Sequence, residues 1–396
     1  MAKVVLAYSG GLDTSVCVKW LKEKYNLDVI CYTADVGQGV NASVLKHRAK
    51  AAGAAKIYIE TKHEEFAEDY VLPALKANAL YEGGYLLATA LSRPLIAKHL
   101  VDVAKKEKAG YVAHGCTGKG NDQVRIEVSA GILAPGLKVI APLRIWELQS
   151  RNEEIDYAAK HKIPIDVTKK SPYSIDKNLW GISIECGALE DPWKEPPKNA
   201  YQLTKDPHDT PDKAEYVQVY FEGGTPKKLN GKSLKLVSLI AALNKIGAKH
   251  GIGRSDMVED RLVGIKSREI YEAPAAWILY LAHKELEALV LDREVLQFKE
   301  LISQKYAALI YNGLWFTPLK SALDKFIDQT QKNVTGSVKI KLYKGKATPL
   351  GRKSRFSLYK KSLATYEKGG KFDQKLAEGF IKIWGLPYEK TLGRKV

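Results

Sequence analysis

The residues best suited to chemistry follow an apolar run near the N-terminus, at Tyr8-Ser9-Gly10-Gly11-Leu12-Asp13-Thr14-Ser15. The two glycines let backbone N–H groups approach an anion closely. The composition of residues 13–25 predicts a helix, whose free N–H groups and positive dipole end would face that anion. Because the hydroxyl groups add further donors, the segment predicts a phosphate site.

This loop differs from two better-known phosphate loops. It has no lysine before the hydroxyl residue, as a Walker A motif requires, and it lacks the Gly-x-Gly-x-x-Gly pattern of dinucleotide sites. Its Ser-Gly-Gly-x-Asp-Thr-Ser pattern resembles the pyrophosphate loop of the ATP pyrophosphatases, which cleave ATP between the α and β phosphates. The alternative is an ordinary turn after a strand, with Asp13 as the N-cap of the helix.

A second glycine-rich loop covers residues 114–125, with the sequence His-Gly-Cys-Thr-Gly-Lys-Gly-Asn-Asp-Gln-Val-Arg. Thr117, Asn121 and Asp122 are suited to an ammonium and a carboxylate, and Arg125 is suited to a planar carboxylate. The loop is therefore a candidate site for a zwitterion. A plain turn with an Asn or Asp helix cap is the alternative.

The first 165 residues alternate strand and helix signals. Short apolar runs predict strands at 3–8, 28–34, 56–60, 111–114 and 137–141, and helical stretches lie at 41–53, 63–78, 86–109 and 122–133. This alternation predicts an α/β fold with a doubly wound parallel sheet and ligands beyond the carboxyl ends of the strands. Tyr8, Ala34 and His114 fall at such ends, so three loops are expected to converge on one nucleotide.

The pattern changes after Pro164. Residues 165–213 are rich in Pro, Lys and Asp, and a strand is predicted at 216–221. Helices are predicted at 233–248, 274–290, 292–311 and 318–332, with a hairpin at Lys344-Gly345. We therefore expect an α+β second domain, with a boundary near 163–168.

The chain has 396 residues and a formal net charge of +17, and its last 58 residues hold 16 Lys or Arg against 4 Asp or Glu. Apolar residues recur at helical spacing in this basic tail, namely Phe372, Leu376, Phe380, Ile381 and Trp384. This spacing favours an assembly arm over a nucleic-acid site. No run approaches the roughly 18 apolar residues of a membrane span, the start lacks a secretory signal, and the four cysteines are widely spaced. We expect a cytoplasmic protein with no nucleic-acid or membrane partner.

Four motifs occur in order along the chain, at residues 8–15, 33–38, 111–125 and 264–274. They begin with Tyr-Ser-Gly-Gly-Leu-Asp-Thr-Ser, Thr-Ala-Asp-Val-Gly-Gln, Tyr-Val-Ala-His-Gly-Cys and Gly-Ile-Lys-Ser-Arg-Glu. Together they resemble the argininosuccinate synthases, which join citrulline and aspartate while ATP is cleaved to AMP and pyrophosphate.

The resemblance implies a fold. It implies a nucleotide-binding domain of the HUP or adenine nucleotide α-hydrolase type over 1–165 and an α+β synthetase domain over 166–368. A C-terminal helical arm over 369–396 and a homotetramer are implied as well. A Mg²⁺ ion shared with the pyrophosphate is expected, held mostly by phosphate and water.

The resemblance also implies site residues. The ATP residues would be Ala7, Tyr8, Ser9, Gly10, Gly11, Leu12, Asp13, Thr14, Ser15, Ala34 and Gly115. Citrulline would contact Tyr85, Asn121, Arg125, Ser174, Ser183, Glu259 and Tyr271, and aspartate would contact Thr117, Asn121 and Asp122. Relatives place Ser where this chain has Ala90, and Thr89 is the candidate for the missing hydroxyl.

Each of these residues has an ordinary structural alternative: a surface charge for Glu259, turn hydroxyls for the serines and core aromatics for the tyrosines. No residue is assigned as general base. Two other functions are alternatives: a tRNA-modifying enzyme with a pyrophosphatase loop, which would explain the basic tail, and a non-enzymatic adenine-nucleotide binding module. The cysteine spacing disfavours sulfur transfer, and the zwitterion-binding residues disfavour a simple binding module.

Overall fold

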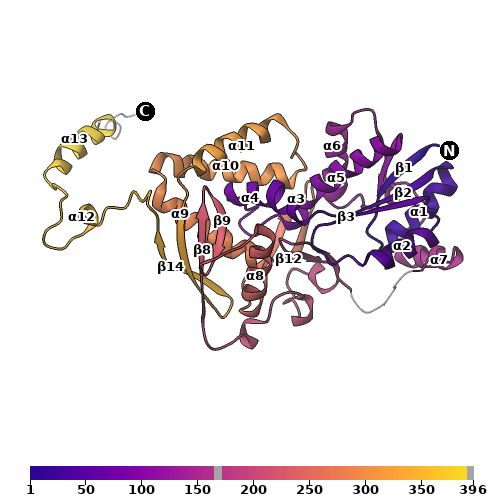
Figure 1. Ribbon diagram of the computed structural model, residues 1–396, viewed down its shortest axis with the longest axis horizontal. Coiled ribbons are helices and arrows are strands. Elements are labelled where there is room, and N and C mark those ends of the chain that lie inside the picture. The colour runs from indigo at the N-terminus through magenta and orange to yellow at the C-terminus, as the bar shows by residue number, and fades with distance from the viewer. Residues whose placement is uncertain (165–171, 390–396) are drawn as a thin grey trace.

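A computed structural model of the chain describes residues 1–164 and 172–389 (Figure 1). The N-terminal domain is built on five parallel strands in the spatial order β3-β2-β1-β4-β5. The strands are β1 (Lys3–Ala7), β2 (Asp28–Asp35), β3 (Lys56–Thr61), β4 (Tyr111–His114) and β5 (Lys138–Ile140). The predicted doubly wound sheet is confirmed, with strand ends within two residues of the predicted ones.

Helices cover both faces of this sheet, because alternate residues of its strands point to opposite sides. Val4 and Leu6 pack with apolar residues of α1, while Val5 packs in a second core with α5. The helical segments are α1 (Leu12–Tyr25), α2 (Ala42–Ala51), α3 (His63–Glu65), η1 (Phe66–Val71), α4 (Leu72–Lys76), α5 (Ala88–Glu107), α6 (Asp122–Leu133) and α7 (Arg151–Lys160).

The C-terminal domain contains two antiparallel sheets. One has the order β10-β9-β8-β13-β14 and the other β11-β12-β7-β6. Their strands are β6 (Ser174–Lys177), β7 (Ile182–Glu185), β8 (Glu215–Glu222), β9 (Thr225–Leu229), β10 (Lys232–Ser233), β11 (Arg254–Asp260), β12 (Lys266–Glu272), β13 (Gly336–Tyr343) and β14 (Lys346–Lys353). The predicted strand and the predicted hairpin at Lys344-Gly345 correspond to β8 and to the β13–β14 turn.

The long helices of this domain are α8 (Leu236–Lys249), α9 (Pro274–Val290), α10 (Arg293–Tyr311) and α11 (Pro318–Gln331). Short helical turns of this domain lie at η3 (Gly187–Glu190), η4 (Lys198–Ala200) and η5 (Pro207–Asp209), and a further one, η2 (Pro142–Arg144), lies in the N-terminal domain. All four predicted helices are confirmed, whereas the sequence pattern did not predict the sheet β11-β12-β7-β6. In the described part of the chain, no helix combines the length and apolarity needed to cross a membrane.

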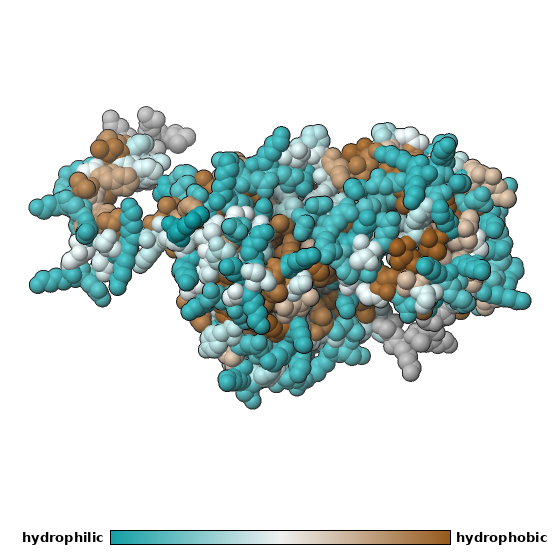
Figure 2. Space-filling model, viewed as in Figure 1, coloured by the Kyte–Doolittle hydropathy of each residue, from teal (hydrophilic) through white to brown (hydrophobic). Residues whose placement is uncertain are grey.

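The C-terminal segment extends away from the rest of the molecule (Figure 1). It carries α12 (Lys361–Ala364) and α13 (Leu376–Glu389). Brown apolar side chains are visible on this arm in Figure 2, and Phe380 and Trp384 are 61% and 60% exposed. Phe372, which sequence spacing placed in the same helix, precedes α13. The predicted domain boundary at 165/166 lies outside the described residues.

A buried ion pair joins α9 to α10. The Lys299 ammonium lies 3.0 Å from Glu287 Oε1, and both residues are 2% exposed. Glu287 also accepts hydrogen bonds from Asn78 Nδ2 at 2.6 Å and from Gln331 Nε2 at 2.7 Å. This carboxylate therefore connects α9 and α10 with the end of α11 and the segment after α4.

We expect Lys299→Met to destabilise the protein by about 3 kcal/mol, because it leaves a buried carboxylate without its counter-ion. Lys305→Met is the matched control, since Lys305 is exposed on the same helix. Chemical unfolding curves of the two variants measure the difference. Equal unfolding midpoints would contradict a structural role for the buried pair.

Candidate functional site

One large pocket collects the predicted site residues. It has a volume of about 940 Å³ and lies between the carboxyl end of the parallel sheet and the sheet β11-β12-β7-β6. All the residues predicted for citrulline and aspartate line it: Tyr85, Thr117, Asn121, Asp122, Arg125, Ser174, Ser183, Glu259 and Tyr271. Of the predicted ATP residues, it is lined by Ala7, Tyr8, Ser9, Asp13, Thr14, Ala34 and Gly115. Gly10, Gly11, Leu12 and Ser15 belong to the same loop and first helical turn.

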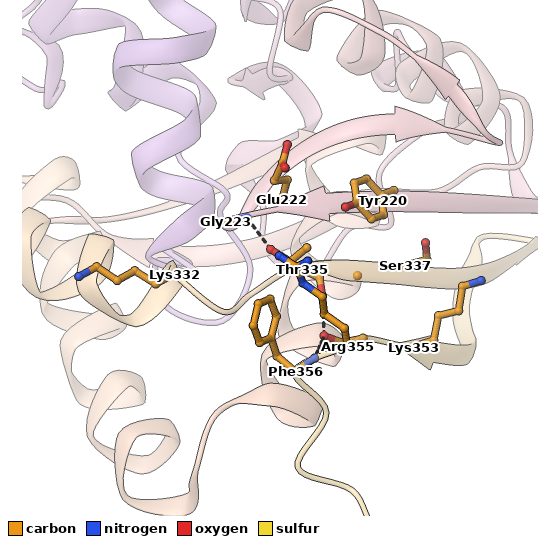
Figure 3. A pocket seen from close by; sticks show the side chains of 11 residues that line it. Tyr220, Glu222, Gly223, Lys332, Thr335, Ser337, Lys353, Arg355 and Phe356 are labelled. Atoms are coloured by element: carbon orange, nitrogen blue, oxygen red, sulfur yellow. Dashed lines mark hydrogen bonds between the residues drawn. The ribbon is translucent and has the colours of Figure 1, made fainter.

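A second cavity, of about 620 Å³, lies in the C-terminal domain near the start of the arm (Figure 3). Its wall includes Lys332, Lys353 and Arg355, together with Glu222. It contains none of the residues that the sequence motifs single out. The larger pocket is therefore the candidate active site.

The phosphate loop lies between β1 and α1. Gly11 is the N-cap of α1 and makes no side-chain cap, and Asp13 lies inside the first turn. The alternative in which Asp13 caps the helix is therefore wrong. Ser9 Oγ lies 3.0 Å from Thr14 Oγ1 and accepts from the Gly11 N–H at 3.3 Å. The first-turn N–H groups of α1 have no partners within the helix, so they are available to an anion.

Two glycines allow close packing around the phosphate loop. Gly10 has φ +77°, and a Cβ there would stand 2.1 Å from Leu45 Cδ2 of α2. A Cβ on Gly115 would stand 2.8 Å from Thr14 Cγ2. The phosphate loop therefore packs against α2 at Gly10, and the loop after β4 packs directly against the first turn of α1 at Gly115.

The sheet topology explains why these loops meet. The order β3-β2-β1-β4-β5 reverses direction between β1 and β4, and at such a switch point the loops after the two strands diverge and leave a crevice. The phosphate loop follows β1 and Gly115 follows β4, so both line this crevice. Ala34, near the end of β2, borders it from the next strand.

His114, Cys116 and Lys119 of the second glycine-rich loop differ in burial and in their contacts. His114 is buried, accepts from the Cys116 N–H at 3.2 Å and contacts Glu127 Oε1 through Nε2 at 2.9 Å, so it shapes the loop. Burial raises the pKa of the Cys116 thiol to about 12, which leaves it protonated at neutral pH. Lys119 is exposed and does not line the pocket.

Asp122 is held by two guanidinium groups. Its Oδ2 accepts from Arg93 Nη2 at 2.7 Å, and its Oδ1 accepts from Arg125 Nη1 at 2.8 Å. Burial acts to raise the pKa of Asp122, but the two arginines outweigh it and hold this pKa at about 2. Arg93 also donates to Asp176 on β6, so it bridges the two domains. The sequence analysis missed Arg93 and Asp176, although both line the pocket.

The sheet β11-β12-β7-β6 presents a row of polar side chains to the pocket. Ser183 pairs with Asp176 on one neighbouring strand and with Tyr271 on the other. Ile182, Ile184 and Ile270 alternate with these residues and form an apolar core on the opposite face. Alternation along each strand therefore separates pocket-lining residues from core residues.

Glu259 is a buried carboxyl group on β11. Its Oε2 contacts the Tyr271 hydroxyl at 2.5 Å, and that hydroxyl also lies 2.8 Å from Glu269 Oε2. Burial and then the neighbouring Glu269 raise the pKa of Glu259 to about 7, against the hydrogen bonds of Tyr271 and Tyr311. This carboxyl group therefore changes its charge near neutral pH, and a bound cation would favour its ionised form.

The hydroxyl that the family resemblance expects at position 90 has a neighbour in this chain. Ala90 is fully buried, whereas Thr89 lines the pocket with its Oγ1 2.6 Å from Ser183 Oγ.

Arg48 of α2 also lines the pocket and donates to the Gly10 carbonyl at 3.0 Å. Arg48, Arg93 and Asp176 reach the pocket from three different elements, α2, α5 and β6, so no local sequence pattern marks them as site residues.

Beside the phosphate loop, α7 places a further acidic group. Glu154 Oε2 is buried and has no hydrogen-bond partner among the described residues. Burial and then the nearby Asp13 raise the pKa of Glu154 to about 8. Across residues 1–164 and 172–389, no group of three or more His, Cys, Asp or Glu side chains is arranged to hold a metal ion.

Comparisons with known proteins agree with this geometry. A family model described as the arginosuccinate synthase N-terminal HUP domain matches residues 3–164, and one for the arginosuccinate synthase C-terminal domain matches residues 173–391. Curated argininosuccinate synthases are similar over nearly the whole chain. The protein from Caldanaerobacter subterraneus subsp. tengcongensis is 58% identical over 99% of this chain and 97% of its own length. That from Oceanobacillus iheyensis is 59% identical over 97% and 92%.

One solved structure, described as a predicted subunit of tRNA methyltransferase from Methanocaldococcus jannaschii, is 16% identical and covers 40% of this chain and 75% of that chain. Its TM-score of 0.27 is too low to carry an argument. The two family models together span both domains, and the curated relatives match at well over half identity. The chain therefore belongs to the argininosuccinate synthase family.

Proposed function

We propose that this protein joins citrulline to aspartate with cleavage of ATP to AMP and pyrophosphate, as a step of arginine biosynthesis. The observation that carries the proposal is the single pocket in which an ATP-pyrophosphatase loop faces zwitterion-binding side chains from both domains. As a ureido oxygen is a poor leaving group, it must first attack the α phosphate to form a citrullyl adenylate. The aspartate amine then displaces AMP.

The phosphate loop supplies most of what the first step requires. Ala7 to Ser15 would surround the phosphates, while Ala34 and Gly115 would contact the adenosine part through backbone groups. The N-terminus of α1 would stabilise the charge that develops on the leaving pyrophosphate. Arg48, whose guanidinium lies at the loop, would add positive charge there. Catalysis by this site would be mainly positioning and charge stabilisation.

Citrulline would bind between the two domains. Arg125 would receive its carboxylate and Glu259 its ammonium, because these are the buried cation and the buried acid of the pocket wall. The other proposed contacts are Tyr85, Asn121, Ser174, Ser183 and Tyr271, with Thr89 in the place of the hydroxyl that Ala90 lacks.

Aspartate would bind on the other side of the second glycine loop. Thr117, Asn121 and Asp122 line the pocket there, and Asp122 is ionised at neutral pH. Its neighbours Arg93 and Arg125 already neutralise that charge in part. The Asp122 carboxylate would therefore orient the incoming amine without holding it too tightly.

Mg²⁺ is proposed as a partner of ATP. Such an ion would be bound mostly by phosphate oxygens and water. Asp13 lines the pocket beside the phosphate loop and is an acidic side chain that would face the ion or its water shell. The ion would neutralise phosphate charge while the chain's own N–H groups fix the phosphate position.

The direct test mixes the purified protein with ATP, citrulline and aspartate. We expect pyrophosphate and argininosuccinate to form in equal amounts, and no pyrophosphate when citrulline is omitted. Release of pyrophosphate with tRNA but not with citrulline would favour the tRNA-modifying alternative, which family membership does not favour. The cytoplasmic location stays a prediction.

Asp122→Asn should separate the two half-reactions, because Asp122 is proposed to bind aspartate and not ATP. We expect the KM for aspartate to rise about tenfold or more, the effect of losing a charge-assisted hydrogen bond. Citrulline-dependent exchange of labelled pyrophosphate into ATP should persist. Asp102→Asn, at an exposed carboxylate on α5, is the control. Loss of exchange in step with synthesis would place Asp122 in the first half-reaction.

The C-terminal arm is proposed to dock on another copy of the chain, in a homotetramer. The arm projects from the molecule, and a helix as short as α13 is marginal in water unless it buries its apolar side (Figure 2). Phe380 and Trp384 stack at 5.6 Å and are exposed, so they offer a ready contact surface. The helix continues the chain beyond the C-terminal domain, which places it within reach of a neighbouring copy.

Truncation after Lys368 should lower the oligomeric mass measured by light scattering. Binding of an apolar dye should rise, because truncation uncovers the surface of the neighbouring copy on which the arm docks. Lys382→Ala, on the charged side of the same helix, should leave the mass unchanged because it removes no apolar contact. An unchanged mass after truncation would contradict the docking role. Tight tRNA binding by the full-length protein at about 0.15 M salt would favour a nucleic-acid role for the tail.

A further inference from the structure

Tyr311 occupies the last position of α10 and is fully buried. It does not line the candidate active site, although four residues that it contacts do: Tyr85, Asn121, Arg125 and Glu259. Asn121 and Arg125 come from the N-terminal domain, while Tyr311 and Glu259 belong to the C-terminal domain. Tyr311 therefore lies behind the pocket wall at the place where the two domains meet.

The hydroxyl, the backbone carbonyl and the ring of Tyr311 each contact other residues. Its hydroxyl lies 2.5 Å from Glu259 Oε1 and 2.8 Å from Asn121 Nδ2. Its carbonyl accepts from Arg125 Nε at 2.8 Å, and the Arg125 guanidinium stands 4.8 Å from the ring centroid. The ring also stacks on Tyr81 at 3.7 Å with an interplanar angle of 6°, and it meets the Tyr85 ring edge-on at 6.3 Å.

The donors and acceptors fix the direction of these hydrogen bonds. The amide nitrogen of Asn121 can only donate, so the phenol oxygen accepts from it and the single phenol proton goes to Glu259. The Asn121 oxygen accepts from the Leu262 N–H at 2.8 Å, which sets the orientation of the amide. One hydroxyl group therefore fixes Asn121 and Glu259 relative to each other across the domain boundary.

The chain after α10 brings Arg125 into the same arrangement. Gly313 has φ +73°, and a Cβ there would stand 2.7 Å from Arg125 Cα. This close approach lets the end of α10 lie directly on the first turn of α6. The Tyr311 carbonyl is then close enough to accept a hydrogen bond from the Arg125 side chain.

We propose that Tyr311 is a positioning residue for citrulline, which orients the ammonium-binding Glu259, the carboxylate-binding Arg125 and Asn121 as one unit. The proposal rests on the citrulline assignment above and goes beyond it, because Tyr311 itself touches no substrate. Because the Tyr311 hydroxyl joins Asn121 of one domain to Glu259 of the other, the citrulline site depends on the correct position of the two domains relative to each other.

The hydroxyl has an electrostatic effect that a purely structural residue would lack. It donates to ionised Glu259. The groups that face this carboxyl are Tyr271 and Glu269 of β12, Arg125 of α6, Tyr311 of α10, and Tyr81 and Tyr85 of the segment before α5. Without the Tyr311 donor, the ionised form loses stabilisation and the pKa of Glu259 rises. Citrulline binding needs the ionised form, so the apparent KM for citrulline should rise as the pH falls below about 7 in the natural protein. In a variant without the hydroxyl, this rise should begin at higher pH.

The test compares Tyr311→Phe with Tyr306→Phe. Both residues are buried tyrosines of α10 whose hydroxyl groups contact a carboxylate, Glu259 for the first and Asp324 for the second at 2.6 Å. Tyr306 does not line the pocket, so its variant controls for loss of a buried hydrogen bond in the same helix. Both variants keep the aromatic ring and its packing.

We expect Tyr311→Phe to raise the KM for citrulline about tenfold, as for loss of a charge-assisted hydrogen bond, with the KM for ATP unchanged. The acidic limb of the citrulline pH profile should move up by about one unit. Tyr306→Phe should leave the citrulline KM and its pH profile unchanged, although its unfolding midpoint should fall because a buried hydroxyl group loses its hydrogen bond to Asp324.

The outcomes separate this inference from the proposed function. If the natural protein forms argininosuccinate and the two variants have equal citrulline KM values and pH profiles, the positioning role is wrong. If Tyr311→Phe raises the KM values for ATP and citrulline alike, Tyr311 serves general folding and the inference is overturned. If the natural protein forms no argininosuccinate, the proposed function itself fails.

Discussion

Arg93 donates both to Asp122 of the N-terminal domain and to Asp176 of the C-terminal domain, and Arg125 completes the neutralisation of Asp122. Their side chains are partly buried, at 15% exposed for Arg93, 26% for Asp122 and 35% for Asp176, so pairing offsets part of the cost of removing these charges from water. The cluster joins the two domains, and all four of its residues line the candidate pocket. Its walls therefore depend on ionic contacts as much as on apolar packing.

The apolar cores explain how each wall keeps its shape. In the N-terminal domain, strand residues pack alternately against helices on both faces, so the ends of β1 and β4 are fixed and their loops meet at the switch point. In the C-terminal domain, isoleucines under the sheet β11-β12-β7-β6 leave the opposite face to Ser183, Tyr271 and their polar neighbours. The parallel sheet therefore positions the phosphate loop on one side of the pocket, and the sheet β11-β12-β7-β6 positions polar pocket-lining side chains on the other.

The electrostatics divide the pocket into regions with different charge. Asp122 stays ionised because two guanidiniums face it, whereas Glu259 changes its charge near neutral pH because it is buried beside Glu269. Tyr271 and Tyr311 both contact Glu259, and Tyr311 connects it to Asn121 of the other domain. Binding of a zwitterion would thus be sensitive to the domain arrangement and to the proton on Glu259.

Local patterns in the sequence predicted the parallel sheet, the glycine loop after β1 and the helices of the C-terminal domain, because each depends on local periodicity or on a glycine pattern. They did not predict the sheet β11-β12-β7-β6, whose strands carry polar residues on one face and whose two hairpins are joined by the long-range pairing of β12 with β7. The motifs named Glu259 and Arg125, but only the tertiary structure placed Tyr311 between them and Arg93 between Asp122 and Asp176. These contacts join elements far apart in the chain, and no local pattern specifies which buried charge or hydroxyl will meet which partner.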